Sequence, residues 1–221
     1  MPVSLIIAAG GSGERFLRNH FPKTSQNGRI SKSKLFFPLL GKPLLVHTIE
    51  KFQDLHEINE IIVVMPPGSV SFLEKWRKTY AWKHIRGVKG GKTRAESVYN
   101  GLQNLKKKNA WVMVHDGARP CITSRSIKKL LAAAERKNAD GVILAAPVIP
   151  TIKRVDLKKE SVRETLDRAL LFEAQTPQLV RRGLLEKAYL KKERAFHATD
   201  EAALLESVGG NVRLVRSDVK C

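Results

Sequence analysis

The chain has 221 residues, 43% of them hydrophobic and 28% charged, with 15 Gly and 10 Pro. This composition is ordinary for a globular protein, and it excludes collagenous, low-complexity and largely disordered classes. With 40 Lys and Arg against 21 Asp and Glu, the net charge is +19, which favours anionic partners such as nucleic acid, a lipid surface or phosphorylated small molecules.

The predicted strands are apolar runs without polar alternation, which is typical of strands buried on both faces. In chain order they cover residues 3–8, 60–65, 85–88, 111–115 and 142–148. Because helical patterns separate them, four or five of these strands should run parallel in one sheet. Ligands are then expected at the carboxyl ends of the strands.

Helical patterns fill the intervals between the strands. Apolar side chains recur on one helical face in residues 44–52, 98–105 and 127–134. Capping residues are predicted for three helices: Ser71 with Glu74, Thr93 with Glu96, and Thr123 or Ser124. Together these elements predict an α/β fold, a three-layer sandwich with a mainly parallel, Rossmann-like sheet.

The stretch from residue 149 to about 171 departs from this pattern, because it is polar and charged and has no long apolar face. β-Branched residues alternate with charges around Val155 and again over residues 161–165, so we expect a two-stranded arm that returns to the body near Thr176. A lone hairpin is marginal in water, so the arm should pack on a partner. No linker divides the chain, and we expect one domain, residues 1–221, carrying this arm.

The sequence also bears on location. Its two cysteines, Cys121 and Cys221, stand far apart and outside any CxxC arrangement, which argues against a disulfide framework and a cysteine zinc site. The longest apolar run, residues 142–149, is interrupted by Pro147 and is too short to span a bilayer, and the apolar start lacks the basic flank of a signal peptide. We expect a cytoplasmic protein without a membrane-spanning segment.

The first predicted strand ends in a glycine-rich loop, AAGGSGER at residues 8–15. Gly10, Gly11 and Gly13 let the backbone approach a ligand closely, and Arg15 adds a forked cation, so the loop suits phosphates. A dinucleotide fingerprint is excluded, because Phe16 stands where its third glycine is needed. A tight turn without a ligand is the alternative.

A second glycine pair, Gly90 and Gly91, follows the third predicted strand and opens a helix. It is not a P-loop, because Arg86 stands where that motif needs its first glycine. A helix N-terminus after two glycines still suits phosphate or polar ligand edges, with Arg94 and Ser97 one turn in. A capped helix without a ligand explains the local pattern equally well.

The fourth predicted strand turns polar at its carboxyl end, in the sequence HDGARP at residues 115–120. A carboxylate in this position can hold Mg²⁺ against phosphate oxygens, so Asp116 is the predicted metal ligand. Arg119 is then a phosphate or substrate contact, the alternative being that it only pairs with Asp116. His115 has no second His or Cys at metal spacing, and we interpret it as a turn residue with satisfied hydrogen bonds.

The segment from Arg15 to Lys42 holds seven Lys or Arg and no acid. Most of these charges fit a solvated loop, and one or two lysines could reach the glycine loop. A basic nucleic-acid-binding protein is the alternative of another class. That alternative lacks a helix-turn-helix, a zinc finger or aromatic residues interleaved with basic ones, and aromatics are only 6% of the chain.

Eight motifs occur in an order that resembles one enzyme family. They are AAGGSGERF, KLFFPLLGKPLLVHTIEKF, GGKTRAESVYNGL, VHDGARP, ILAAPVIPTIKR, TLDR, AQTPQ and TDEAALLE. Together they resemble the 2-C-methyl-D-erythritol 4-phosphate cytidylyltransferase family over residues 6–220, and VHDGARP and AQTPQ are the most specific parts. Ribitol 5-phosphate cytidylyltransferase shares much of this pattern and stays open as the alternative.

The resemblance implies a nucleotidyltransferase fold and transfer of CMP from CTP to the phosphate of methylerythritol phosphate, with release of pyrophosphate. The positions that match the family's CTP site are Ala9, Gly10, Gly11, Gly13, Gly91, Arg94 and Ser97. By the same resemblance, Arg15 and a loop lysine would stabilise the transition state, and Asp116 would hold Mg²⁺ as cofactor. The excess of Lys and Arg then serves two polyanionic substrates.

The acceptor site is also carried over from the resemblance. Its matching positions are Gly117, Arg119, Thr151, Arg168, Thr176 and Thr199, and the family's catalytic C-terminal lysine corresponds to Lys220. Thr151 and Arg168 lie at the two ends of the predicted arm. In the family this arm crosses to a twofold partner, so the resemblance implies a homodimer in which these two residues complete the neighbour's site.

The sequence departs from the family in two places. The catalytic loop lysine corresponds to Lys23 by its preceding proline and to Lys34 by its downstream context. We choose Lys34, because a residue held by an ordered segment is easier to preorganise. Near the end of the chain, Asp218 replaces the family's Asn before Lys220, which adds a negative charge close to an anionic substrate, and Asp218 could instead assist the metal.

Overall fold

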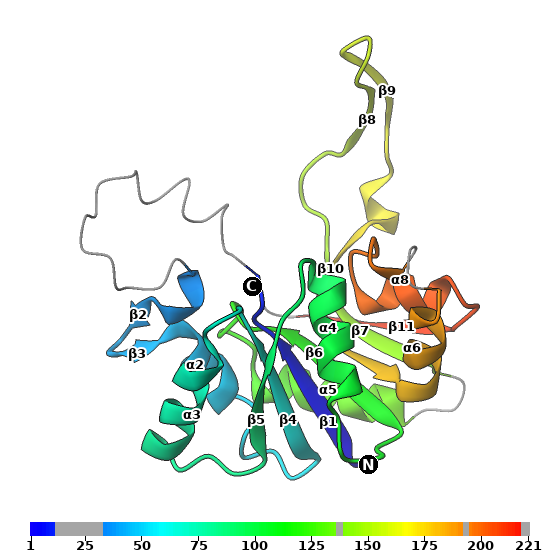
Figure 1. Ribbon diagram of the computed structural model, residues 1–221. Helices are drawn as coiled ribbons and strands as arrows, with labels where there is room; N and C mark the ends of the chain where they lie inside the picture. Colours follow the sequence, from blue (N-terminus) through cyan, green and yellow to red (C-terminus); the bar gives the residue numbers. More distant parts are fainter. Residues whose placement is uncertain (12–32, 136–138, 192–194, 218–221) are drawn as a thin grey trace, which may run out of the picture.

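The computed structural model describes residues 1–11, 33–135, 139–191 and 195–217. Within these residues one seven-stranded sheet has the order β11-β7-β10-β6-β1-β4-β5 (Figure 1). Its strands are β1 (Val3–Ala8), β4 (Ile58–Met65), β5 (Ile85–Lys89), β6 (Trp111–Asp116), β7 (Gly141–Pro147), β10 (Phe172–Arg181) and β11 (Val212–Arg216). All of them run in one direction except β10, which is antiparallel to both of its neighbours, β6 and β7.

The mainly parallel sheet confirms the predicted fold class, and each of the five predicted strands lies within two residues of its expected bounds. Sequence reasoning missed β10 and β11. The signal of β10 is interrupted by Pro177 and by flanking polar residues, where the ladder to β7 shifts register. β11 is an edge strand with the sequence VRLVR, in which Arg213 and Arg216 are exposed, and this mixture of charged and apolar residues resembles a polar loop.

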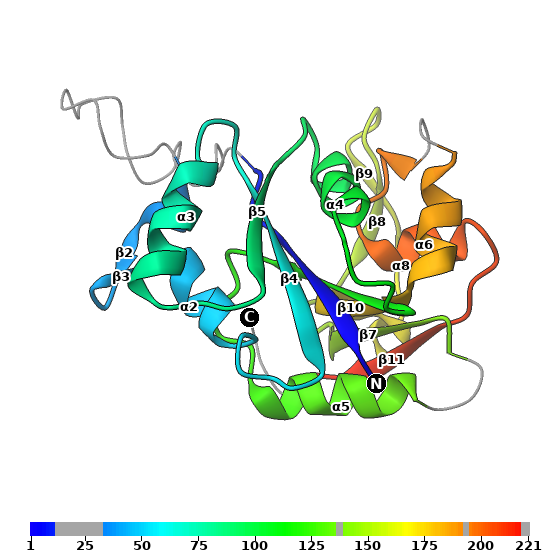
Figure 2. The same cartoon turned by 60° about the horizontal axis from the view of Figure 1, so that its bottom comes forward.

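Helices cover both faces of the sheet. They are α2 (Leu44–Glu50), α3 (Val70–Thr79), α4 (Arg94–Gln103), α5 (Ser124–Ala134), α6 (Arg182–Tyr189) and α8 (Glu201–Glu206). Alternate residues of β1 serve the two faces: Leu5 and Ile7 pack with α2, α3 and α5, whereas Ile6 packs with α4, α6 and α8. Figure 2 shows α5 on one side of the sheet and α4, α6 and α8 on the other, so the predicted three layers are present.

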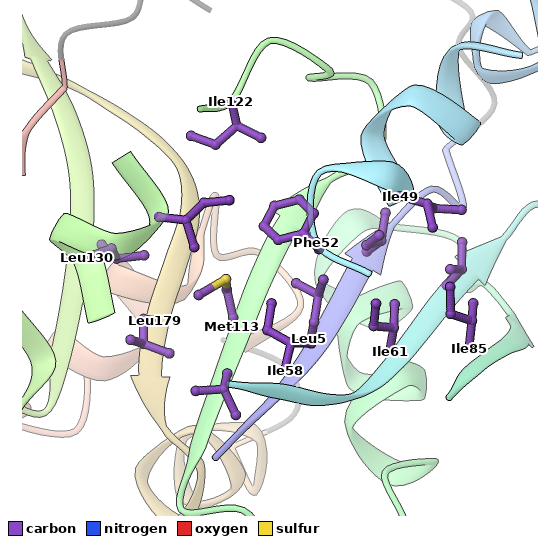
Figure 3. Close-up of a cluster of buried hydrophobic side chains, with 14 of the residues drawn as sticks. Leu5, Ile49, Phe52, Ile58, Ile61, Ile85, Met113, Ile122, Leu130 and Leu179 are labelled. Atoms are coloured by element: carbon purple, nitrogen blue, oxygen red, sulfur yellow. The ribbon is translucent and has the colours of Figure 1, made fainter. Parts of the chain in front are cut away.

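The larger core cluster lies on the face covered by α2, α3 and α5. Leu5, Phe52, Met113, Leu130 and Leu179 are fully buried there and meet from five different segments (Figure 3). Burying each large apolar side chain contributes roughly 1.5–3 kcal/mol relative to leaving it in water. This packing fixes β1 and β6, the two strands whose carboxyl ends carry the first glycine loop and Asp116.

Two of the predicted helix caps are confirmed. The hydroxyls of Thr93 and Thr123 accept hydrogen bonds from the backbone N–H three residues on, at 3.0 and 3.1 Å, and so start α4 and α5. The predicted cap at Ser71 is wrong. Because α3 begins at Val70, Ser71 lies inside the first turn, and Glu74 pairs with Arg77 instead.

The predicted arm is present as an antiparallel hairpin of β8 (Lys153–Asp156) and β9 (Ser161–Thr165). It projects away from the rest of the molecule in Figure 1, and η2 (Arg168–Leu170) leads from it back to β10. Cross-strand contacts hold the hairpin: Lys153 Nζ donates to Thr165 at 2.6 Å, and Arg163 pairs with Asp156 at 2.7 Å. In the described part of the chain no helix is long and apolar enough to cross a membrane.

Candidate active site

A hollow of about 1150 Å³ opens at the carboxyl ends of β1, β4, β5 and β6. Its wall includes the loops after these strands and the short helix η1 (Lys34–Phe36). The predicted site residues found in this wall are Ala9, Gly10, Gly11, Lys34, Gly91, Arg94, Ser97, Asp116 and Arg119. Three sequence motifs that were weak one by one therefore converge on one place.

The two glycine loops touch backbone to backbone in the floor of this hollow. A Cβ on Gly10 would lie 3.2 Å from the Cα of Gly90 and 2.7 Å from the hydroxyl oxygen of Ser97. A Cβ on Gly90 would in turn lie 2.9 Å from the Cα of Gly10. These distances leave no room for a side chain, so close approach requires glycine at both positions.

The second glycine loop is held by the first turn of α4. The Gly91 N–H donates to the Ser97 hydroxyl at 3.1 Å, and the Lys92 N–H donates to the Glu96 carboxylate at 2.7 Å. The Glu96 carboxylate therefore accepts from the residue before Thr93, whereas in a capping box it would accept from the Thr93 N–H itself. Ser97 is buried, and its hydroxyl holds the glycine loop by accepting the Gly91 N–H. Its contact with CTP stays a prediction.

Asp116 lies between two arginines at the end of β6. Its Oδ1 accepts from Arg94 Nε and its Oδ2 from Arg119 Nε, each at 3.1 Å. Burial by itself raises the pKa of Asp116, but Arg94 and Arg119 outweigh burial and lower this pKa below its ordinary value. The carboxylate is therefore ionised at neutral pH. Arg119 pairs with Asp116 and also lines the hollow, so its contact with a phosphate or substrate stays a prediction.

Arg94 makes a second, bidentate ion pair. Its Nη1 and Nη2 donate to the two carboxylate oxygens of Glu201 at 2.8 and 3.0 Å. Burial lowers the pKa of Arg94, but Glu201 and Asp116 outweigh burial and raise it. Three of the five donors of this guanidinium are thereby used inside the protein. Arg94 is mainly a bridge between two carboxylates, with fewer donors left for a nucleotide than the resemblance implies.

His115 supports the same turn from within the core. It is fully buried, and its Nε2 lies 3.0 Å from the carbonyl oxygen of Arg119. Burial lowers the pKa of His115 to about 4, so the imidazole is neutral at pH 7 and donates its Nε2–H to that carbonyl. His115 lies at the end of β6 and supports the following turn through Nε2, but the prediction that its hydrogen bonds are satisfied is wrong for Nδ1, which is buried without a hydrogen-bond partner among the described residues.

Lys34 reaches the wall of the hollow from η1. The Ser33 hydroxyl accepts the backbone N–H of Leu35 and caps this short helix, and Leu35 is buried. The helix then connects through a small hairpin, β2 (Pro38–Leu39) and β3 (Lys42–Pro43), to α2. Five other predicted residues lie outside the described residues: Gly13, Arg15, Lys23, Asp218 and Lys220.

The predicted acceptor positions fall into two groups. Gly117 and Thr176 adjoin Asp116: Gly117 follows it in the chain, and the Thr176 hydroxyl accepts the Asp116 N–H at 3.2 Å. Gly117 is buried. Its N–H donates to the carbonyl of Ala8, and its carbonyl accepts from the Thr48 hydroxyl, so both backbone groups are used within the protein. Thr151, Arg168 and Thr199 are exposed and do not belong to the wall of the hollow. Arg168 Nη1 instead donates to the carbonyl of Ile149 at the base of the arm, at 2.8 Å.

Sequence reasoning missed several residues of the site. Pro66 and Pro67, which follow β4, line the hollow together with Lys92 and Thr93. The pair of prolines directly after an apolar run was a signal for a rigid strand end that could have been used. Glu201 could not have been found in this way, because a glutamate in the first turn of a helix is usually an exposed residue that favours the helix N-terminus.

The side chains in the wall of the hollow fit a metal ion that is bound together with substrate phosphates. No group of three or more His, Cys, Asp or Glu among the described residues could hold a metal alone. Asp116 is the one acidic residue in the described wall, beside the cations of Lys34, Lys92 and Arg119. Mg²⁺ commonly takes one or two carboxylates plus substrate phosphates, and each oxygen of Asp116 keeps a lone pair beyond its arginine bond. The residues present fit Mg²⁺ on these terms.

Comparison with known proteins gives a consistent result. A family model described as 2-C-methyl-D-erythritol 4-phosphate cytidylyltransferase matches residues 3–220. A protein of that name from Alkaliphilus metalliredigens is 40% identical over 216 residues, which cover 96% of this chain and 83% of the relative. One of the same name from Caldanaerobacter subterraneus is 35% identical, with 100% of this chain and 92% of the relative covered.

Solved structures agree with this match. The crystal structure of 4-diphosphocytidyl-2C-methyl-D-erythritol synthase from Anaerococcus prevotii superposes with a TM-score of 0.81 at 27% identity and covers 98% of this chain and 89% of that one. The 2-C-methyl-D-erythritol 4-phosphate cytidylyltransferase of Francisella tularensis gives a TM-score of 0.76 at 32% identity, with 99% and 92% covered. The similarity therefore extends over sequence and fold alike.

Proposed function

The chain belongs to the 2-C-methyl-D-erythritol 4-phosphate cytidylyltransferase family, and we infer that it transfers CMP from CTP to 2-C-methyl-D-erythritol 4-phosphate. The observation that carries this conclusion is the match over residues 3–220, which includes every motif that converges on the hollow. The products are 4-diphosphocytidyl-2-C-methyl-D-erythritol and pyrophosphate.

The reaction requires the protein to position the two substrates and to supply positive charge. A phosphate oxygen of the acceptor attacks the α-phosphorus of CTP, and the bond from that phosphorus to the oxygen bridging to the β-phosphate breaks. Pyrophosphate leaves with the electron pair. The acceptor phosphate is already anionic near neutral pH, so no Ser, Cys or His has to activate it. The protein must hold two polyanions together and neutralise the charge that develops in the transition state.

We place CTP in the hollow, over the two touching glycine loops. The support is the open backbone of Gly10, Gly11 and Gly91 beside the N-terminus of α4, which favours anionic groups. Ala9 and Ser97 then shape the floor beneath the nucleotide. Lys34 supplies a cation from the opposite wall, and Arg15 and Gly13 remain predicted members of the same site.

Asp116 is the proposed ligand for Mg²⁺. The ion, when bound, would supply a Lewis acid that neutralises phosphate charge. The protein's own part is to keep the carboxylate ionised and oriented, which Arg94 and Arg119 do at 3.1 Å each. Removal of divalent metal with a chelator should abolish turnover and leave the fold intact, since within the described residues Asp116 pairs with arginines without a metal.

The acceptor is proposed to bind beside Asp116, with Arg119 and Thr176 on its near side. Thr151 and Arg168 lie at the two ends of the arm and do not line the hollow of their own chain, which supports the proposal that they complete the site of a second copy. Exposed apolar side chains on the arm and at its base support the same homodimer: Ile149, Val155, Leu157, Val162 and Leu170. Such a surface is stabilised when a partner covers it.

The whole chain is proposed to be one nucleotidyltransferase domain, since one sheet runs from residue 3 to residue 216. A cytoplasmic location is proposed for two reasons. The two cysteines stand far apart in the sequence, which argues against a disulfide framework, and the proposed substrates are small anions. The excess of Lys and Arg then raises the local concentration of CTP and acceptor by electrostatic attraction.

The test is pyrophosphate release by the purified protein with Mg²⁺ and CTP. 2-C-Methyl-D-erythritol 4-phosphate and ribitol 5-phosphate are offered in parallel, and ATP, GTP and UTP replace CTP as controls. We expect turnover with CTP and methylerythritol phosphate alone. Equal turnover with ribitol 5-phosphate, or no release with either acceptor, would contradict the assignment.

A further inference from the structure

Glu201 is a buried carboxylate that none of the sequence motifs assigned to the site. Its side chain is 1% exposed, against 30% for Arg94 and 27% for Asp116. Burying a carboxylate costs free energy unless a cation and hydrogen bonds compensate the charge. Arg94 compensates Glu201 with both terminal nitrogens of its guanidinium, Nη1 and Nη2. The Arg94 guanidinium in turn reaches Asp116 at 3.1 Å.

The position of Glu201 is itself fixed by β10. Gln178 accepts the Ala202 N–H at 3.0 Å and donates to the Asp200 carboxylate at 2.9 Å, and Asp200 caps α8. The first turn of α8 is therefore clamped to the sheet at the residues flanking Glu201. This rigidity allows Glu201 to set the place of a neighbouring side chain.

Arg94 needs such a partner because of its own position. It is the first residue of α4, where the helix dipole disfavours a cation. It also lies in the wall of the hollow that we propose to bind the phosphates of CTP. Without Glu201, the guanidinium would be free to turn toward the phosphates or to rotate on Asp116.

We propose that Glu201 is a positioning residue for cytidylyl transfer: through Arg94 it fixes the orientation of the Asp116 carboxylate at the hollow. The ion chain Glu201, Arg94, Asp116 joins α8, α4 and β6, which are far apart in the sequence. The consequence for turnover rests on the proposed function, whereas the consequence for geometry does not.

The first experiment compares Glu201→Gln with the parent enzyme. The amide keeps the shape but presents an N–H group to one fork of Arg94, so the bidentate pair is lost. We expect kcat to fall at least tenfold, while calorimetry still finds one CTP bound per chain with a dissociation constant within threefold of the parent. Glu186→Gln is the matched control, because Glu186 also pairs with an arginine, Arg182 at 2.7 Å, but is 43% exposed and outside the hollow.

The second experiment is a double-mutant cycle. If Glu201 acts only through Arg94, then Glu201→Gln should cause no further loss of kcat/KM in an Arg94→Met background. In that background the substitution should even raise Tm, since it removes an unpaired buried charge. Two results would overturn the proposal. One is a loss of kcat/KM from Glu201→Gln that is as large in the Arg94→Met background as in the parent, and the other is a kcat of Glu201→Gln within twofold of the parent.

A third variant covers the case in which Glu201→Gln does not fold. Arg94→Lys keeps the charge but cannot reach both carboxylates with a planar fork. We expect it to lose as much kcat as Arg94→Met, and near-parental activity would count against the bridge. Should the parent enzyme itself show no turnover, the proposed function fails, and the geometry is judged by a crystal structure of Glu201→Gln or Arg94→Lys. An Asp116 carboxylate that keeps its orientation there would refute the positioning role.

Discussion

Single glycine residues determine the shape of the floor of the hollow. Gly10 and Gly90 approach each other so closely that neither can carry a side chain, whereas a Cβ on the adjacent Gly11 would meet no atom of the described residues within 4 Å. Neighbouring glycines of one motif therefore have different reasons to be glycine. The first is required by packing, and the second leaves open space for a ligand.

This contrast gives a matched pair of variants. Gly10→Ala should lower the free energy of unfolding by about 1–3 kcal/mol, because its methyl group overpacks the contact with Ser97 and Gly90. Gly11→Ala should leave the unfolding free energy unchanged within about 0.5 kcal/mol. Urea denaturation of both proteins without substrates measures the difference, and equal stability of the two variants would refute the role of the close approach.

Lys34 is the residue on which the catalytic assignment of the basic segment depends. Lys34→Ala should reduce kcat by about 100-fold or more, because removing one donor to transition-state charge typically costs that much. Lys51→Ala is the control, since Lys51 is exposed after α2 and outside the wall. Steady-state pyrophosphate release measures both. Full activity in Lys34→Ala with a loss in Lys23→Ala would transfer the role to Lys23.

At the scale of elements, one buried carboxylate ties the opposite end of the sheet together. Glu60 of β4 accepts from Arg86 at 2.7 Å and from the N–H groups of Lys106 and Lys107 at 2.9 and 3.0 Å. The Ser4 hydroxyl adds a bond from β1 at 3.3 Å. The loop before β6 is thus fixed to β4 and β5 at the amino ends of the strands, away from the hollow.

The charge of Glu60 makes part of the stability depend on pH. Burial raises its pKa, but hydrogen bonds from Lys106, Lys107 and Arg86 outweigh burial and lower this pKa below the model-peptide value of 4.5. A carboxyl group with a lowered folded-state pKa contributes stability above the unfolded-state value and loses it as pH falls through the folded-state value.

We therefore expect Glu60→Gln to lower the unfolding free energy at pH 7 by about 1–3 kcal/mol, because the amide cannot accept at both oxygens. The difference from the parent should shrink as the pH falls below 4.5. Urea denaturation between pH 7 and pH 3 measures it, with the exposed pair variant Glu74→Gln as control at less than about 0.5 kcal/mol. A difference that stays constant with pH would contradict the account.

At the scale of the whole molecule, the arm is the proposed contact between two chains. Val162 on β9 is 61% exposed and Leu157 in its turn is 85% exposed, which is unfavourable in water without a partner. Val162→Asp should convert a dimer to a monomer in sedimentation analysis. Leu190→Asp is the control, because Leu190 is 81% exposed at the end of α6, on another part of the molecule. A dimer that survives Val162→Asp would locate the interface elsewhere.

The proposed sharing of each active site between two chains predicts complementation. Arg168→Ala and Asp116→Ala should each be inactive alone, and subunit exchange between them should restore up to about a quarter of parental activity, since half of the dimers are hybrids with one intact site each. Pyrophosphate release after mixing measures the recovery. Absence of recovery, with exchange verified independently, would show that Arg168 does not act on the partner's site.

Local patterns in the sequence were sufficient for the five apolar parallel strands, although not for the parallel edge strand β11, and for the caps at Thr93 and Thr123, the arm, and the motifs that converge on the hollow. Each of these features depends on residues close together in the chain, whose periodicity or spacing is visible in the sequence. The missed strand β10 and the misplaced cap at Ser71 show the limit, because burial and helix start depend on neighbours from elsewhere.

Only the tertiary structure decided which distant groups meet. Gly10 and Gly90 touch because β1 and β5 flank β4 and end at the same edge of the sheet. Arg94 meets Glu201 because α4 and α8 cover the same face, and β10 fixes α8 there through Gln178. The choice of partner for a buried charge is set by topology and desolvation, and neither is written in the local pattern around Arg94 or Glu201.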